Sequence, residues 1–187
     1  MKPLRTVAET DGLVLKTRGT EFLLFTGGKL LMSSTRHGSE DELAQRGCER
    51  LATGAPRVLI GGLGFGYTLR AALDVLAPSA EVTVCEASAA LVDWNRTEVA
   101  HLAENPLADG RVRVVVGDVQ KTISAKAEAF DAILLDVDNG PFALSRPSNT
   151  RLYTREGMAL IRRALTPRGR LVIWSATDDA AFARLLE

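Results

Sequence analysis

The sequence predicts an α/β fold, in which a Rossmann-like parallel sheet follows a small N-terminal antiparallel β extension. From residue 57 onward, short apolar runs alternate with segments of helical periodicity. This pattern is typical of parallel strands covered by helices on both faces. Before that point, short apolar runs are separated by turns that contain glycine, which favours antiparallel pairing. We therefore expect a β-hairpin extension over residues 1–36 and a Rossmann-like domain over residues 37–187.

Short strands are expected in the N-terminal extension. The apolar runs 12–17, 21–26 and 29–32 are separated by turns at Gly19 and at Gly27. Glycine supplies the backbone conformations that such tight turns require. The runs therefore predict a small antiparallel sheet.

A helix is expected after these strands. Ser39 is followed three residues later by Glu42, which is the spacing of a capping box, where the two side chains satisfy backbone N–H groups at a helix start. This motif predicts a helix from Ser39 to about Ala52.

The remaining elements alternate along the chain. Strands are expected at residues 58–61, 81–85, 111–116, 130–136 and 170–174, and helices at residues 67–76, 87–96, 119–126, 154–165 and from Asp178. Residues 130–136 are nearly all apolar, which predicts a central place in the sheet. The long irregular segment 137–153 is expected to be functional, because loops of that length are uncommon in compact domains.

Composition and charge exclude several classes of function. The chain has 187 residues, 46% of them hydrophobic, and equal numbers of basic and acidic residues. This balance lacks the basic excess that binding to nucleic acid or to an anionic membrane would favour. No apolar run approaches the roughly 20 residues of a membrane span, and the N-terminus has no apolar core of a secretory signal. We expect a cytoplasmic protein in which Cys48 and Cys85, both in apolar patterns, are buried free thiols.

A glycine-rich loop follows the first strand of the alternating part. Gly62, Gly64 and Gly66 form a G-x-G-x-G pattern between that strand and the next helix. Ligands of open α/β sheets bind at the carboxyl ends of the strands, where strand order reverses. The pattern predicts that these glycines let a ligand approach the backbone, although a tight turn without a ligand would use the same residues.

Two carboxylates at later strand ends indicate the kind of ligand. Glu86 ends the second strand, twenty residues after Gly66, where a carboxylate can accept hydrogen bonds from ribose hydroxyls. A nicotinamide dinucleotide and an S-adenosyl nucleoside both fit. The G-x-G-x-G spacing and Asp118, which could accept from an adenine amino group, favour the S-adenosyl nucleoside. Asp118 could equally cap the following helix, and the two roles can coexist.

Two further carboxylates follow the fourth strand. Asp136 and Asp138 stand at its carboxyl tip, facing the same edge of the sheet as the glycine loop. Their mutual repulsion would raise at least one pKa or attract a cationic partner, and an amine substrate would fit. The alternative is a simple turn that Asp136 caps.

With these motifs assembled, the chain resembles the spermidine/spermine synthase family, the polyamine aminopropyltransferases, from about Glu21 to Trp174. The family carries a small N-terminal β-domain and a class I methyltransferase-like Rossmann domain. Its glycine loop is similar to residues 62–70, its ribose-binding acid to Glu86, its Gly-Asp to residues 117–118, its acidic loop to residues 136–141, its L-F/Y-T to residues 152–154 and its early D-E pair to residues 41–42.

The resemblance implies transfer of an aminopropyl group from decarboxylated S-adenosylmethionine to an amine. Asp136 would take the proton of the amine, while Asp138 and Tyr153 would bind the substrate. Gly62, Gly64, Gly66, Glu86 and Asp118 would bind the nucleoside. No metal is required, and the partners would be small-molecule nucleoside and amine substrates.

Three positions depart from the family pattern and keep two alternatives open. Phe65 stands where the family has an aspartate that grips the donor's aminopropyl amine, and Gln45 and Arg46 replace its tyrosine and histidine. Phe65 would suit ordinary S-adenosylmethionine, which favours a methyltransferase. The altered amine pocket favours a non-catalytic nucleoside-binding homologue.

The C-terminal end also departs from the expected fold. Class I methyltransferase folds usually continue past the fifth strand into a β-hairpin, and residues 180–187 leave no room for one. We expect that these C-terminal strands are missing. The open edge would allow pairing with a second copy of the chain as a homodimer.

Overall fold

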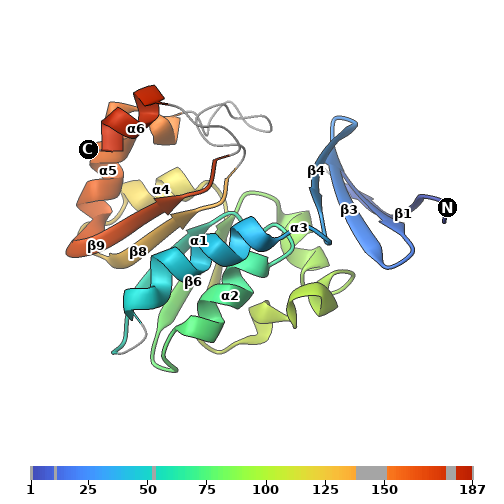
Figure 1. Ribbon diagram of the computed structural model, residues 1–187, viewed down its shortest axis with the longest axis horizontal. Coiled ribbons are helices and arrows are strands. Elements are labelled where there is room, and N and C mark those ends of the chain that lie inside the picture. Colours follow the sequence, from blue (N-terminus) through green and yellow to red (C-terminus); the bar gives the residue numbers. More distant parts are fainter. Residues whose placement is uncertain (1, 11, 52–53, 138–150, 176–179, 187) are drawn as a thin grey trace.

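The computed structural model describes residues 2–10, 12–51, 54–137, 151–175 and 180–186. It confirms the predicted α/β fold and contains two sheets (Figure 1). A four-stranded antiparallel sheet has the order β1-β2-β3-β4, and a five-stranded parallel sheet has the order β7-β6-β5-β8-β9. The small sheet lies at the opposite end of the molecule from the C-terminus.

The N-terminal sheet has one strand more than the sequence indicated. Its strands are β1 (Arg5–Thr10), β2 (Leu13–Arg18), β3 (Glu21–Thr26) and β4 (Lys29–Ser33). β1 was missed because most of its residues are exposed, so it lacks the apolar alternation that marks a half-buried strand. Backbone pairing with β2 holds it in place.

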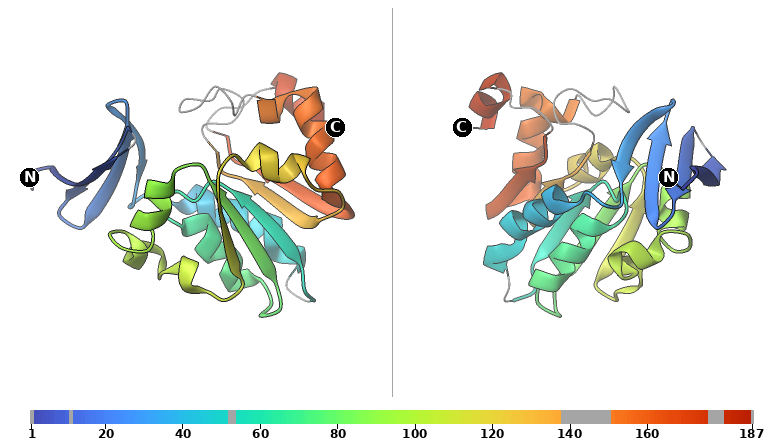
Figure 2. Two further views of the ribbon diagram at one scale, coloured as in Figure 1. Left: turned by 180° about the vertical axis from the view of Figure 1, so that it is seen from behind. Right: turned by 45° about the vertical axis from the view of Figure 1, so that its right-hand side comes forward.

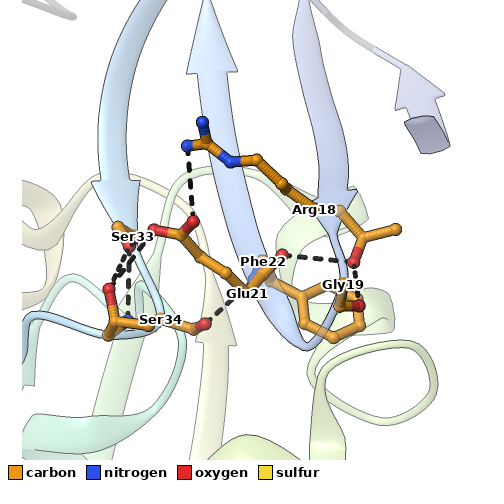
Figure 3. A network of polar contacts seen from close by, with 8 residues as sticks. Arg18, Gly19, Glu21, Phe22, Ser33 and Ser34 are labelled. Atoms are coloured by element: carbon orange, nitrogen blue, oxygen red, sulfur yellow. Dashed lines mark hydrogen bonds and ion pairs between the residues drawn. The ribbon is translucent and has the colours of Figure 1, made fainter. Parts of the chain in front are cut away.

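A network of polar contacts fixes the end of β4 against β3 (Figure 3). The Glu21 carboxylate accepts a hydrogen bond from the Ser33 hydroxyl at 2.7 Å and pairs with Arg18 at 3.3 Å. The hydrogen bond from Ser33 lowers the pKa of Glu21. The Ser34 hydroxyl accepts from the backbone N–H of Phe22 at 2.9 Å. These contacts set the position from which the chain enters the first helix.

Helix α1 (Gly38–Cys48) begins one residue earlier than predicted, and the capping box does not form. The Ser39 hydroxyl donates to the side chain of Glu40. The first turn closes instead on the carbonyl of His37, which accepts from the N–H groups of Glu40 and Asp41. The predicted extent was also too long, because a 3-10 turn, η1 (Glu49–Leu51), follows Cys48.

The Rossmann-like part alternates as expected. Its elements are β5 (Arg57–Gly61), α2 (Tyr67–Val75), β6 (Glu81–Glu86), α3 (Ala89–Trp94), η2 (Ala100–Ala103), η3 (Pro106–Ala108), β7 (Val112–Val116), α4 (Val119–Ser124), β8 (Phe130–Leu135), α5 (Arg155–Ala164), β9 (Leu165–Ile173) and α6 (Ala180–Leu186). All neighbouring strands of this sheet are parallel. β9 begins earlier than predicted, directly after α5, and its pairing with β8 shifts register near its start.

Helices cover both faces of the parallel sheet (Figure 2). α1 and α2 pack on one face, where their apolar side chains join Val58, Ile60 and Leu134 in one core cluster. α4 and α5 pack on the other face against Leu59 and Leu135. β8 is buried along nearly its whole length, which confirms its predicted central place.

The order of the strands fixes where the sheet can hold a ligand. The chain passes from β5 to β6 on one side, and later returns to β8 on the other side of β5. The carboxyl ends of β5 and β8 therefore flank the point at which strand order reverses. β9 is an edge strand of the described sheet, and the pairing of this edge with another chain stays a prediction.

The structure also bears on the two cysteines and on membrane-spanning helices. Cys48 and Cys85 are free and buried, as predicted. None of the described helices is long and apolar enough to cross a membrane.

Candidate active site

The glycine loop between β5 and α2 lies against other segments of its own chain. Gly62 has a left-handed backbone with φ of 92°, and a Cβ at this position would overlap the backbone carbonyl of Asp136. A Cβ at Gly64 would lie 2.9 Å from Cε of Met32, and one at Gly66 would lie 3.1 Å from Oδ1 of Asn95. The fold itself thus requires the glycines, and their predicted contact with a ligand stays a prediction.

Asn95 connects the glycine loop to helix α3. Its side chain is 1% exposed, and its amide donates to the carbonyls of Gly64 at 2.8 Å and Leu91 at 2.9 Å. Among the described residues, its Oδ1 has no hydrogen-bond partner. The sequence reasoning missed Asn95, because no local pattern signals its bond to Gly64, which lies 31 positions earlier in the chain.

Glu86 connects the end of β6 to the glycine loop. One carboxylate oxygen accepts from the N–H of Leu63 at 3.0 Å, and the other accepts from the N–H of Ser88 at 2.8 Å. Each oxygen retains a second lone pair that a hydroxyl group can use. Glu86 is therefore oriented by backbone donors at the position where the sequence predicted contact with ribose.

Asp118 caps helix α4, as one of its two predicted roles requires. Its side chain accepts from the N–H of Gln120 at 2.8 Å. Val116, which pairs with Glu86 in the sheet register, is 54% exposed. This exposed apolar side chain offers a surface for a flat base, and the contact of Asp118 with adenine stays a prediction.

Asp136 continues β8 at the carboxyl edge of the sheet. Its N–H donates to the carbonyl of Gly61 at 2.8 Å, and its Oδ2 accepts from the hydroxyl of Thr68 at 2.8 Å. Burial raises the pKa of Asp136 to about 6; the Thr68 hydrogen bond opposes this rise and the nearby charge of Glu40 adds to it. Thr68, which the sequence reasoning missed, is buried at the start of α2.

Of the two predicted substrate-binding residues, the structure describes Tyr153. Asp138 lies outside the described residues. Tyr153 is buried, its hydroxyl donates to the carbonyl of Val137 at 3.2 Å, and its ring meets Phe182 edge-on at 5.4 Å. Tyr153 thus holds the backbone of Val137, the residue after Asp136. Its contact with a substrate stays a prediction.

The three positions that depart from the family pattern differ in burial. Phe65 is 1% exposed and packs among Leu15, Leu24 and Trp94, in the core that the N-terminal sheet shares with the glycine loop. Gln45 and Arg46 are exposed on α1, and Arg46 pairs with Glu42. Within the described ranges, no three His, Cys, Asp or Glu side chains form a group that could hold a metal ion.

The parallel sheet with its glycine loop, together with the N-terminal antiparallel sheet, makes this a Rossmann-like α/β protein. A sequence profile of the spermine/spermidine synthase domain matches residues 50–179, which is more than half of the chain. The chain therefore belongs to the spermine/spermidine synthase domain family, and the resemblance carried by its motifs is confirmed.

Individual relatives agree with this assignment. The chain is 32% identical over 163 residues to a Streptomyces coelicolor protein named polyamine aminopropyltransferase 2, covering 84% of this chain and 28% of that protein. The curated relatives it matches are much longer, because it spans 28% to 35% of three of them.

Two solved structures share the fold at 18% sequence identity. The spermidine synthase of Thermotoga maritima has a TM-score of 0.74 and is matched over 97% of this chain and 61% of that chain. A spermidine synthase in complex with the transition state analogue AdoDATO has a TM-score of 0.67 over 87% of this chain and 53% of that chain.

Proposed function

We propose that the protein transfers an aminopropyl group from decarboxylated S-adenosylmethionine to an amine. The observation that carries the proposal is Asp136, a carboxylate beside the glycine loop whose pKa burial raises to about 6. A base with a pKa just below the operating pH is largely ionised and still accepts a proton effectively. The names of the relatives, which are polyamine aminopropyltransferases, support the same reaction.

The nucleoside half of the site is proposed to lie along the ends of β5, β6 and β7. Glu86 accepts hydrogen bonds from the ribose hydroxyls, and Asp118 accepts from the adenine amino group. Val116 offers apolar surface to the base, since it is exposed beside both carboxylates. The glycine loop brings backbone close to the sulfonium centre.

The chemistry is proposed to occur beside Asp136. The carboxylate takes a proton from the ammonium form of the acceptor, and the freed nitrogen lone pair attacks the methylene carbon next to sulfur. A carbon–nitrogen bond forms as the carbon–sulfur bond breaks, and its electron pair neutralises the sulfonium to a thioether. The leaving group is already activated, so orientation and a base are the main requirements.

A methyltransferase that uses ordinary S-adenosylmethionine is the second candidate. It is favoured by Phe65, because this side chain is packed into the core and the loop offers no carboxylate at that position to the donor's amine. The same base and nucleoside residues would serve that reaction, and the transferred group would then be methyl.

Assays with both donors test the proposal. Decarboxylated and ordinary S-adenosylmethionine are each combined with putrescine and with spermidine, and products are identified by mass spectrometry. We expect an aminopropylated product, and Asp136→Asn should reduce turnover by about 10²- to 10⁴-fold. Its affinity for methylthioadenosine, measured by calorimetry, should stay near that of the wild type.

The matched control is Asp93→Asn, which alters an exposed carboxylate on α3 that pairs with Arg96. It should leave turnover unchanged. Full turnover by Asp136→Asn would exclude the mechanism, and a methylated product would establish the second candidate. Absence of turnover with every pair would indicate a binding-only homologue.

A further inference from the structure

Three consecutive carboxylates in the first turns of α1 have different surroundings. Asp41 pairs with His37 at 3.0 Å, and Glu42 pairs with Arg46 at 2.6 Å. Both of these acids are exposed. Glu40 is half-buried, and among the described residues no cationic group lies within ion-pair distance of it. Two of the three carboxylates thus have a histidine or arginine partner on the surface, and the third does not.

The helical repeat places Glu40 on the inward face of α1. The buried residues of this helix are Leu43, Ala44, Gly47 and Cys48. Residues three and four positions apart lie on the same side of a helix. Glu40 precedes Leu43 by three positions and Ala44 by four, so it continues the buried stripe toward the start of the helix.

This stripe runs along β8 toward Asp136. Gly47 lies against Leu134, since a Cβ there would be 2.8 Å from that side chain. Asp136 follows Leu134 by two positions, so both point to the same face of the sheet. Two helical turns separate Gly47 from Glu40. The carbonyl of Arg46 accepts from Arg170, which pairs with Ala132 nearer the start of β8, so Glu40 lies toward the carboxyl edge.

The electrostatic surroundings agree with this placement. Burial raises the pKa of Tyr67, and the charge of Glu40 adds to the rise; the same charge acts on Asp136. Tyr67 stacks on His37 at 4.2 Å, and its hydroxyl donates to the carbonyl of Ser34 at 2.9 Å. The start of α2 therefore presents Tyr67 toward α1 and Thr68 toward Asp136.

We propose that Glu40 binds the second, non-reacting ammonium group of a diamine acceptor while Asp136 serves the reacting nitrogen. The inference rests on the proposed function and adds a residue that the motifs did not indicate. The charges of Glu40 and Asp136 interact unfavourably, and a positive charge placed near both carboxylates removes that cost. A diamine brings one positive charge for each carboxylate, whereas a monoamine brings only one.

Calorimetry with two amines tests this assignment. 1,4-Diaminobutane and n-butylamine are titrated into the protein saturated with methylthioadenosine, for the wild type, Glu40→Gln and the control Glu42→Gln. Glu42 belongs to the same helix but is exposed and paired with Arg46. We expect Glu40→Gln to weaken binding of the diamine by about 10- to 100-fold, the loss of a charged hydrogen bond. Binding of n-butylamine and of methylthioadenosine should change by less than about 3-fold, and Glu42→Gln should resemble the wild type.

Turnover gives a second readout, because a ground-state anchor affects KM more than kcat. Glu40→Gln should raise the KM for the diamine by a similar factor, with kcat nearly unchanged. Circular dichroism melting verifies that each variant is folded. The charge-retaining Glu40→Asp should recover part of the affinity for the diamine.

The possible results separate this inference from the proposed function. Wild-type affinity of Glu40→Gln for the diamine, an equal loss for n-butylamine, or an equal loss in Glu42→Gln would each overturn the assignment. A wild type that binds no diamine would overturn it as well. Diamine binding that depends on Glu40 without transfer from either donor would refute the proposed function and leave the assignment in place. Transfer by Glu40→Gln with an unchanged KM for the diamine would refute the assignment of Glu40 and leave the proposed function in place.

Discussion

Asp136 carries an energetic conflict between burial and charge. Its pKa is raised from an ordinary value of 3.8 to about 6, so the folded protein holds this proton more tightly than the unfolded chain does. The stability that results is fully present below about pH 4 and is lost as the pH rises through 6. The difference between these two pKa values corresponds to on the order of 3 kcal/mol. The folded protein therefore bears this cost at neutral pH, where a base is useful.

Replacing this carboxylate should stabilise the protein at high pH only. Asp136→Asn cannot ionise, and its amide oxygen can still accept from Thr68. We expect the variant to be more stable than the wild type at pH 8 by about 1–3 kcal/mol and nearly equal to it at pH 4. Urea denaturation at the two pH values measures the difference. The control Asp93→Asn should show no such pH dependence, and an equal difference at both pH values for Asp136→Asn would contradict the interpretation.

Some site residues were visible in the sequence, and others depend on contacts between distant segments. Glu86 and Asp136 could be predicted because each directly follows an apolar strand, and strand ends share one edge of a parallel sheet. Thr68 and Asn95 could not be assigned roles. Their partners, Asp136 and Gly64, are 68 and 31 positions away in the chain, and no local pattern reports such proximity.

The glycine loop follows β5 and lies against the backbone that follows β8. Gly62 and Gly28 both have left-handed backbones, with φ of 92° and 77°. Of these two, Gly62 lies against another backbone segment, whereas a Cβ at Gly28 would meet nothing within 4 Å. Substitutions at Gly28 and Gly62 therefore separate the cost of a left-handed backbone from the cost of a clash with another backbone segment.

Alanine substitutions at these two glycines should differ in effect. Gly28→Ala should cost about 1–2 kcal/mol, the penalty of a left-handed residue with a side chain. Gly62→Ala should cost at least about 2 kcal/mol more, because its Cβ would displace the backbone of Asp136. Chemical denaturation of both variants measures the two free energies of unfolding. Equal costs would show that the contact between the loop and Asp136 relaxes freely.

The accuracy of the predicted elements follows their burial. β5 and β8 were found because buried apolar runs between turn residues are a strong signal. β1 was missed because it is mostly exposed, and the start of α1 was misplaced because Ser39 bonds to Glu40 instead of the backbone. Local motifs decide such ends only where no competing partner is near.

Considering the complete fold, the N-terminal sheet shares a core cluster with the glycine loop and with helices α2 and α3 of the Rossmann-like part. Leu15 and Leu24 of the N-terminal sheet pack with Phe65 of the glycine loop and with Trp94 of α3. Met32 of β4 also contacts Gly64. The small sheet thus packs directly on the glycine loop.

This shared core predicts that the two sheets unfold together. Leu24→Ala should destabilise the protein by about 2–5 kcal/mol while unfolding stays a single transition. The control Leu30→Ala, on β4 and 54% exposed, should change stability by less than about 0.5 kcal/mol. Tryptophan fluorescence and far-ultraviolet circular dichroism should report the same midpoint. Two separate midpoints in either variant would show that the N-terminal sheet folds independently.

The contacts that hold the glycine loop also bear on how a ligand could be selected there. Met32, Asn95, Glu86 and the carbonyl of Asp136 already fix the loop before anything binds. A ligand that enters meets an immobilised backbone, so little conformational entropy is lost on association. A rigid loop of this kind treats the shared part of related donors alike. Under the proposed function, discrimination among the tails of donors, and among acceptors, would then depend on side chains of α1 and on those that follow β8.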